Sequence, residues 1–251
     1  MEEKRRGIGQ DFIEIMALIA MFLDHFASTY VEQCRLGEYN LSDGMLAAFA
    51  NPYAKGWMIA YLVLKIIGRI AFPIYAYNIA MGAKRTRNLR KYFIRVILLA
   101  VISEVPYDLA FFGKTLFWDN QNVLFSFSIC LLTIDVNKFL MKKISGAGGK
   151  LTAGLLCCLA MALAYFLNVD YGIFGALFVF IIYYFPEKTI KYLVASGLLV
   201  FYSIGELFGL SAVPLIMFCN GKRKRKLKIF FYLFYPIHLI VLFLLVRKCG
   251  R

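Results

Sequence analysis

Asp24 and His25 lie side by side, deep within the first long apolar stretch of this 251-residue sequence. An imidazole takes up and returns protons near neutral pH, and the sequence holds only one other histidine. Ionisable groups inside a membrane are costly and usually face the protein interior or a water-filled cavity. We therefore predict His25 as a general base and Asp24 as its neighbour in a catalytic site. The alternative is a pair of buried polar groups that a neighbouring helix satisfies.

Arg69 lies within the second apolar stretch, where its permanently charged guanidinium offers five donors and requires an anionic partner. Adjacent residues project about 100° apart on a helix, so Asp24 need not contact His25 and is free to pair with Arg69 or another cation. Glu104 and Asp108 are two other possible partners of Arg69. In the functional interpretation, Arg69 anchors an anionic or carbonyl group of a substrate, and the two roles are compatible.

Other polar groups lie within or beside later apolar stretches. Glu104 and Asp108 are spaced i, i+4 around Pro106 and share a helix face, as expected of a proton relay, an amine-binding pair or ion-pair partners. Asn122 either lines the mouth of a cavity or caps a helix, and His238 is a packing residue or part of the site. The predicted substrate-binding or oxyanion-stabilising residues are Arg69, Glu104, Asp108, Asn122 and His238.

Basic residues cluster between the apolar stretches, and 29 of them against 15 acidic residues give a net charge of +14. In a membrane protein such clusters mark cytoplasmic loops, so we predict no nucleic-acid partner. No Cys/His spacing indicates a metal site. Some of these cations are also suited to the phosphates of a nucleotide-like donor. The predicted donor-binding residues are Arg85, Arg87 and Arg95, with a contribution from the basic run 222–228.

The composition indicates the elements that position these residues. The sequence is 61% hydrophobic and 18% charged, against about 45–50% and 25% in soluble domains. This predicts an all-α, polytopic transmembrane helix bundle of about 8–10 spans in a single domain, 1–251. The predicted spans are 12–30, 56–81, 93–112, 123–140, 151–169, 172–185, 190–204, 207–219 and 229–246. Two of the three short spans between 172 and 219 have an alternative interpretation as half-spans that enter a cavity.

The basic clusters also predict an orientation. With a cytoplasmic N-terminus, the loops after the second, fourth, sixth and eighth spans face the cytoplasm and hold most of the Lys and Arg residues. The first span exceeds the length of a signal-peptide core and is expected to be retained. His25 lies about 20 Å along that helix, past the midplane toward the outer face. The predicted location is the cytoplasmic membrane, with lipid as a partner, and the oligomeric state stays open.

Several segments together resemble the TraX-like family, named for the membrane protein that N-acetylates F-type conjugative pilin. The resemblance runs in order along nearly the whole chain and is weakest between about 140 and 215. The segments are DFIEIMALIAMFLDH, GRIAFPIYAYNIAMGAKRTRNLRKYFIRV, SEVPYDLAF, QNVLFS and FFYLFYPIHL.

TraX-like proteins are also similar, more distantly, to the large transmembrane acyltransferase-3 family. Those enzymes begin their first span with an aspartate, an arginine three positions later and a histidine eleven positions after that. Asp11 and His25 keep this spacing, whereas Glu14 stands at the arginine position. By this resemblance, the histidine that is important in the family corresponds to His25. Because position 14 holds glutamate, the resemblance does not extend to any role that depends on the arginine.

The resemblance implies transfer of an acyl group, expected to be acetyl, from acetyl-CoA or another acyl-CoA to an amine or hydroxyl of a peptide or small-molecule acceptor. In this hypothesis CoA phosphates bind the cytoplasmic arginines, His25 deprotonates the acceptor, and Arg69 or Asn122 stabilises the oxyanion. Two other classes stay open: a small transporter or flippase that uses the intramembrane charges, and a non-catalytic assembly or anchoring protein. Without the resemblance, transport would be the first choice.

Overall fold

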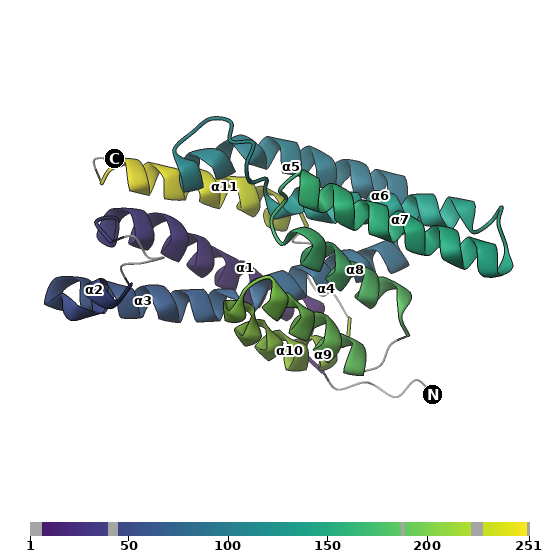
Figure 1. Ribbon diagram of the computed structural model, residues 1–251, viewed down its shortest axis with the longest axis horizontal. Coiled ribbons are helices and arrows are strands. Elements are labelled where there is room, and N and C mark those ends of the chain that lie inside the picture. The colour runs from purple at the N-terminus through teal and green to yellow at the C-terminus, as the bar shows by residue number, and fades with distance from the viewer. Residues whose placement is uncertain (1–6, 40–44, 187–188, 222–227, 250–251) are drawn as a thin grey trace.

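The protein is a bundle of helices in the computed structural model, which describes residues 7–39, 45–186, 189–221 and 228–249. The described residues form no β-strand, and their two bridges between backbone segments are isolated pairs. The predicted all-α fold is therefore confirmed. Figure 1 shows the helices in two groups, with α5, α6, α7 and α11 running together along one side of the molecule.

The first apolar stretch forms α1, Gln10–Phe26, which continues directly as a π-helix, Ala27–Arg35. Together these elements give a 26-residue helix, longer than the roughly 20 residues that cross the hydrocarbon core. The π-helix begins two residues after His25, and the Thr29 hydroxyl donates to the His25 carbonyl at 2.7 Å. Long π-helical segments are rare and tend to occur next to functional sites.

The second apolar stretch, predicted as one span over 56–81, is broken into two helices. After a short helix α2, Met45–Ala50, helix α3 covers Pro52–Gly68 and α4 covers Ala71–Arg85. Pro73 explains the break, because it has no N–H to donate to the carbonyl four residues before it. Such interruptions are tolerated at membrane depth only where protein or a water-filled cavity surrounds them.

The next three helices follow one another along the chain, and each lies antiparallel to the one before it in this group. They are α5, Leu89–Phe112, α6, Val123–Leu140, and α7, Gly146–Phe166. The side chains of Asn88 and Asn122 cap α5 and α6 by accepting hydrogen bonds from backbone amides of their first turns. The cap alternative for Asn122 is thus the observed arrangement.

The region predicted as three short spans forms α8, Gly172–Tyr184, α9, Thr189–Leu198, a 3₁₀ turn, Leu199–Phe201, a 3₁₀ helix, Ile204–Ser211, and α10, Ala212–Met217. The longest of these has 13 residues, which rise about 20 Å against the roughly 30 Å of a hydrocarbon core. These lengths are those expected of half-spans rather than of full crossings.

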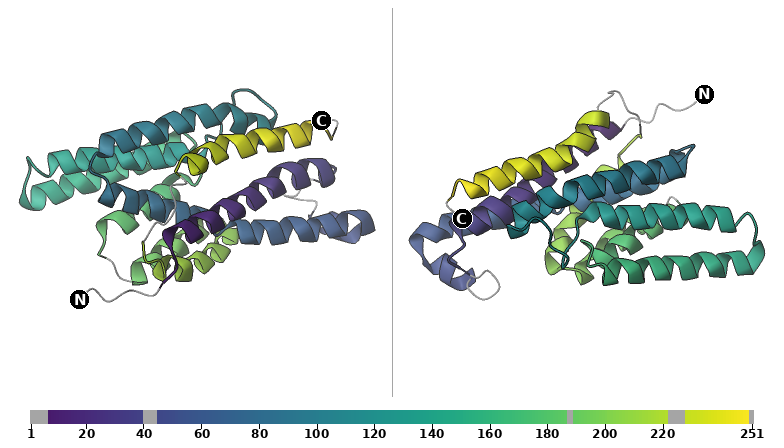
Figure 2. Two further views of the ribbon diagram at one scale, coloured as in Figure 1. Left: turned by 180° about the vertical axis from the view of Figure 1, so that it is seen from behind. Right: turned by 90° about the horizontal axis from the view of Figure 1, so that it is seen from above.

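The chain ends with α11, Lys228–Arg247, which packs along α5. On the other side of the bundle, α1 packs against α3 and α4, and α8 packs against α4 (Figures 1 and 2). The largest group of buried apolar residues lies where α4, α6 and α8 meet, and includes Ile74, Phe127 and Phe178. This core fixes α4 against the helices that face it.

Five helices of the described part are long and apolar enough to cross a membrane, which supports a multi-pass membrane protein. They are Gln10–Arg35, Pro52–Arg85, Val123–Leu140, Gly146–Phe166 and Ile229–Arg247. The predicted count of about 8–10 also included α5 and the three shorter segments. Although α5 has 24 residues, it carries five charges: Arg90, Lys91, Arg95, Glu104 and Asp108.

Contacts place the basic segments at one end of the bundle. The N-terminal segment bonds to the segment before the basic run, as the Ile8 amide donates to the Phe218 carbonyl at 2.8 Å. Lys138, at the end of α6, donates to the Ala83 carbonyl near the end of α4 at 3.2 Å. Arg85, at the end of α4, donates to the Gln10 side chain at the start of α1 at 3.1 Å. The start of α1 and the ends of α4 and α6 are therefore neighbours, as expected if these basic segments share one side of the membrane.

The opposite end of the bundle gathers the end of the π-helix, the start of α3 and the end of α11. The Arg35 guanidinium lies 4.9 Å from the Trp57 ring centroid, and the Cys34 thiol approaches the Val246 carbonyl at 3.9 Å. Aromatic and basic side chains of this kind are common at membrane interfaces. The two ends thus differ in charge, with the larger basic clusters at the end that holds the start of α1.

We expect cysteines placed at Lys143 and at the native position Cys249 to face opposite compartments, with Lys143 in the cytoplasm because basic loops are retained there. In a variant otherwise free of cysteine, a membrane-impermeant maleimide added to intact cells should label Cys249 and leave Lys143→Cys unlabelled until the membrane is permeabilised. Labelling of both positions from one side would contradict this topology.

Candidate functional site

A cavity of about 600 Å³ lies between α1, α4, α5, α6 and α11. Arg85 and Arg95 line it near the end of α4 and the start of α5, and Asp24 and His25 line it at the other end of α4. The 15 residues of α4, from Ala71 to Arg85, span roughly 20 Å of helix. One continuous space therefore connects the basic end of the bundle with the predicted base.

The two histidines of the sequence, 213 residues apart, meet at the inner end of this cavity. Nδ1 of His25, on α1, lies 2.8 Å from Nε2 of His238, on α11. Nδ1 of His238 lies 2.8 Å from the carbonyl oxygen of Phe234, one turn earlier in α11. His25 lines the cavity, whereas His238 is buried behind it and does not. The predicted substrate contact of His238 is thus replaced by a contact with His25.

Aromatic rings surround the histidine pair. Phe111 packs edge-on against His25 with ring centroids 5.2 Å apart, and the Phe234 ring lies parallel to His238 at 5.0 Å. Tyr235 contacts both imidazoles and lines the cavity. These aromatic side chains belong to α5 and α11, which pack closely against each other. Their packing holds the His238 ring on α11 next to the His25 ring on α1.

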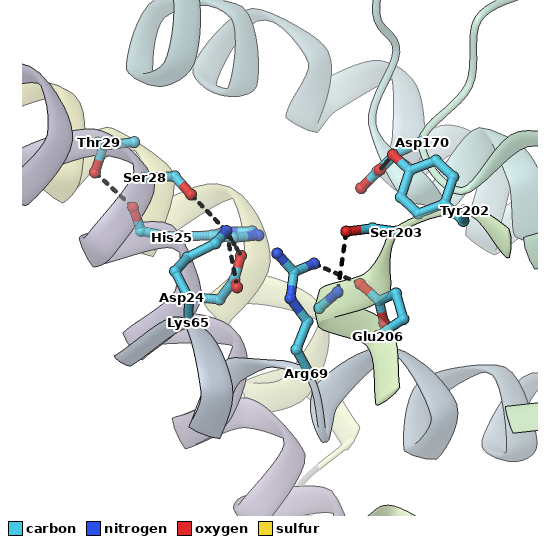
Figure 3. A network of polar contacts seen from close by, with 11 residues as sticks. Asp24, His25, Ser28, Thr29, Lys65, Arg69, Asp170, Tyr202, Ser203 and Glu206 are labelled. Atoms are coloured by element: carbon cyan, nitrogen blue, oxygen red, sulfur yellow. Dashed lines mark hydrogen bonds and ion pairs between the residues drawn. The ribbon is translucent and has the colours of Figure 1, made fainter. Parts of the chain in front are cut away.

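Asp24 lies next to a lysine rather than an arginine. Its carboxylate oxygens are 3.0 and 3.1 Å from Nζ of Lys65 on α3, and the same Nζ donates to Ser28 at 2.8 Å (Figure 3). Gly68 makes this approach possible, because a Cβ atom at that position would lie 2.4 Å from the Cβ of Asp24. Of the two alternatives predicted for Asp24, Arg69 or another cation, the structure shows the second: the partner is Lys65, one turn before Arg69.

Arg69 caps the end of α3 and forms an ion pair with Glu206, at 2.5 Å between Nη1 and Oε1 (Figure 3). Glu206 is completely buried, and no side chain or backbone group of the described residues forms a hydrogen bond with its other oxygen, Oε2. The expected partners Asp24, Glu104 and Asp108 are therefore not the ones used. Arg69 does not line the cavity, so its predicted role as a substrate anchor gains no support from this geometry.

Asp170, in the connection between α7 and α8, supplies a second carboxylate at the inner end of the cavity. Its Oδ1 accepts hydrogen bonds from the Tyr202 hydroxyl at 3.1 Å and the Tyr171 amide at 2.9 Å. Tyr171 has a φ of 62°, which is uncommon for a residue other than glycine, and its ring stacks on Phe72 with centroids 3.7 Å apart. The packed ring therefore holds this turn, and with it Asp170, in place.

At the basic end, Arg85 is held by a chain of amides. Its Nη1 donates to Oε1 of Gln10 at 3.1 Å, and Nε2 of Gln10 donates to Oδ1 of Asn78 at 2.7 Å. All three residues line the cavity. Gly221 completes the wall, since a Cβ atom there would lie 2.7 Å from Nη2 of Arg85. These contacts hold the guanidinium of Arg85 in place at the basic end of the cavity.

The three predicted donor-binding arginines are not equivalent. Arg85 and Arg95 line the cavity, whereas Arg87 lies over a shallow surface depression with Asn88 and Lys91. The contribution predicted for the run 222–228 falls mainly on residues 222–227, which lie outside the described residues. Two arginines rather than three therefore remain candidates for phosphate contacts inside the cavity.

Glu104, Asp108 and Asn122 stabilise the connection between α5 and α6. Oε2 of Glu104 accepts hydrogen bonds from the backbone and side-chain nitrogens of Asn122, at 3.1 and 2.5 Å. Oδ2 of Asp108 accepts from the Phe117 amide at 2.8 Å. None of the three carboxylate or amide groups lines the cavity, so the geometry gives them a structural rather than an oxyanion role.

Sequence reasoning missed several residues of this site, namely Gln10, Lys65 as the partner of Asp24, Asn78, Asp170 and Glu206. Lys65 and Glu206 carried a usable signal, because each is a charge within or beside an apolar stretch that must have a counter-charge. Gln10, Asn78 and Asp170 carried none, since neutral amides and loop carboxylates are common outside sites. The described residues contain no group of three or more His, Cys, Asp or Glu side chains able to hold a metal.

The Arg69–Glu206 pair yields a test of stability. Glu206→Ala leaves a largely buried guanidinium without its counter-charge, so we expect it to lower the free energy of unfolding by about 3–5 kcal/mol. The double variant Arg69→Met, Glu206→Leu should recover most of this loss, because neither charge remains. Thermal unfolding in detergent measures both effects. Arg90→Ala, which removes an exposed ion pair with Asp135, is the control and should change little.

Comparison with known proteins gives the relationship of the chain. The TraX protein family matches residues 9–246. A curated relative, the "Probable fimbrial assembly protein FimC, serogroup H1" of Dichelobacter nodosus, is 28% identical over 262 residues, covering 92% of this chain and 92% of the relative. No solved structure matches the chain. The family match extends over nearly the whole sequence, including both histidines and both cavity arginines, and this multi-pass membrane protein therefore belongs to the TraX family.

Proposed function

We propose that the protein is a membrane acyltransferase that moves an acyl group, most simply acetyl, from cytoplasmic acyl-CoA to an amine of a peptide acceptor. The observation that carries the proposal is the single cavity lined by Arg85 and Arg95 at one end and by His25 at the other. A donor with anionic phosphates at one end and a thioester at the other matches this distribution of charge and base.

The basic end supports binding of the CoA phosphates. Guanidinium groups bind phosphate oxygens through paired, charge-assisted hydrogen bonds. The Gln10–Asn78 amides hold Arg85 in one orientation, which lowers the entropy lost when a phosphate binds. The pantetheine arm then extends through the mainly apolar middle of the cavity, past Phe127 and Val123, toward His25.

The inner end supports proton transfer during acyl transfer. The acceptor nitrogen forms a bond to the carbonyl carbon of the thioester, and its proton passes to the imidazole of His25. The carbon–sulfur bond then breaks, and the leaving thiolate takes that proton from His25. The carboxylate of Asp170 lines the same region and attracts an acceptor that arrives as an ammonium ion. That ion first loses one proton to water, and the resulting neutral amine is the nucleophile.

The likeness to a fimbrial assembly protein supports a fimbrial or pilin-type subunit as the acceptor. Such subunits leave the cytoplasm through the membrane, so a multi-pass enzyme in the cytoplasmic membrane meets them there. In this proposal the basic end faces the cytoplasm and its acyl-CoA pool, in agreement with the positive-inside rule.

A transporter is the second candidate, because the broken helix α3–α4 resembles the discontinuous helices that hold substrates in secondary transporters. The ion pairs of Asp24 and Arg69 lie at that break. The two functions differ in their products. An acyltransferase releases free CoA thiol and an acylated acceptor, whereas a transporter moves an unchanged substrate across vesicle membranes.

His25→Gln should abolish acceptor-dependent release of CoA thiol, with a loss of at least about 100-fold in kcat, because in this proposal the imidazole is the group that takes the acceptor proton. The assay uses purified protein in detergent with acetyl-CoA and a short peptide that carries a free N-terminal amine. Full transfer by His25→Gln, or substrate flux across vesicles without thiol release from the wild-type protein, would contradict the proposal.

Arg85→Gln should raise the KM for acetyl-CoA by about tenfold and leave kcat within about twofold, since the guanidinium binds the donor equally in the ground and transition states. The matched control is Arg90→Gln, an exposed arginine that does not line the cavity. Acetyl-CoA should also raise the thermal unfolding temperature of the wild-type protein more than that of Arg85→Gln. Equal values for both variants would remove Arg85 from the donor site.

A further inference from the structure

We propose that His238 is a positioning residue that holds the His25 imidazole in one tautomer, with the proton on Nδ1 and the lone pair on Nε2. The inference rests on the proposed function only in giving that lone pair the role of general base. The tautomer itself follows from two contacts of the histidine rings, and it can be measured without any assay of acyl transfer.

The first contact fixes the proton of His238. The carbonyl oxygen of Phe234 can only accept a hydrogen bond, and it lies 2.8 Å from Nδ1 of His238. Nδ1 of His238 therefore carries hydrogen. A neutral imidazole has a single N–H, so Nε2 of neutral His238 presents a lone pair.

The second contact transfers this constraint to His25. Nε2 of His238 lies 2.8 Å from Nδ1 of His25, and two lone pairs at that distance would repel each other. His25 must therefore donate from Nδ1, which leaves Nε2 of its neutral ring unprotonated. The three groups form a chain in which His25 donates to His238 and His238 donates to Phe234.

The geometry of the two rings supports a directed hydrogen bond. Their planes differ by 22° and their centroids are 5.1 Å apart. With the nitrogens 2.8 Å apart, this separation corresponds to rings that meet edge to edge in nearly the same plane. Only 3% of His238 is exposed, and Phe22, Phe234 and Tyr235 pack around it. Water therefore has little access to compete for Nε2 of His238.

The hydrogen-bonded chain from His25 to Phe234 stabilises the protonated form of His25 during the reaction. When Nε2 of His25 takes the proton of the acceptor amine, the resulting imidazolium keeps its Nδ1–H bonded to the lone pair of His238. A charge-assisted hydrogen bond is stronger than a neutral one, so His238 stabilises the cation that forms during transfer. His238 does not line the cavity, and it acts through His25 rather than by contact with substrate.

The tautomers can be read by NMR of protein labelled with ¹⁵N-histidine, reconstituted in detergent micelles at a pH where both rings are neutral. The sequence has two histidines, so the spectrum contains four ring nitrogens, and His238→Gln assigns them by removing one ring. Couplings to the ring carbon-bound protons distinguish Nδ1 from Nε2. We expect protonated Nδ1 and unprotonated Nε2 in both rings. Protonated Nε2 in wild-type His25 would overturn the inference, whether or not the protein transfers acyl groups.

Variants test the effect on catalysis. His238→Phe keeps a planar ring but removes the acceptor, so His25 should populate both tautomers and kcat should fall at least about tenfold while the KM for acetyl-CoA changes less than about twofold. His238→Gln supplies an amide oxygen that accepts from Nδ1 of His25, and should restore part of the loss. The matched control is Ile237→Val, a half-exposed neighbour on α11. An unchanged His25 spectrum and unchanged kcat in His238→Phe would overturn the positioning role.

Discussion

The energetic cost of an unpaired charge inside lipid governs how this protein is assembled. Asp24 lies against Lys65, and Arg69 lies against a fully buried Glu206. Both pairs join elements far apart in sequence, and both lie where α3 gives way to α4. Removing one member of such a pair leaves a buried charge without compensation, so the pairs fix the helices around the break in one arrangement.

The two histidines satisfy the same constraint without a permanent charge. Neutral imidazoles bond to each other and to a backbone carbonyl, so each buried N–H has an acceptor. This arrangement tolerates burial in an aromatic environment, and it leaves Nε2 of His25, a residue that lines the cavity, with a lone pair. A buried lysine or carboxylate in that position would require its own counter-charge, and the pair would then be unable to exchange a proton freely.

The cavity is the space left between two helix groups that are each well packed. On one side α5 joins α6 and α11, on the other α1 joins α3 and α4, and the core around α4 and α8 holds the second side (Figure 2). Glu104 and Asn122 secure the connection from α5 to α6 away from the cavity. Arg85 and Arg95 line one end of this space, and Asp24 and Asp170 line the other. Glu14, one turn after Gln10 on α1, also lines it.

Hydropathy in the sequence determined the helical class and the bounds of the helices at 123–140 and 229–246. The charge clusters determined that the basic loops lie on one side, and the rarity of an imidazole in an apolar stretch singled out His25 as a candidate site residue. These features depend on nearest neighbours along the chain and on the contrast between lipid and water. The break in 56–81 and the short helices between 172 and 217 depended on packing against other segments. Only the tertiary structure paired Lys65 with Asp24, Glu206 with Arg69 and His238 with His25, because the choice among several possible counter-groups is made by distances between helices, which residue spacing does not contain.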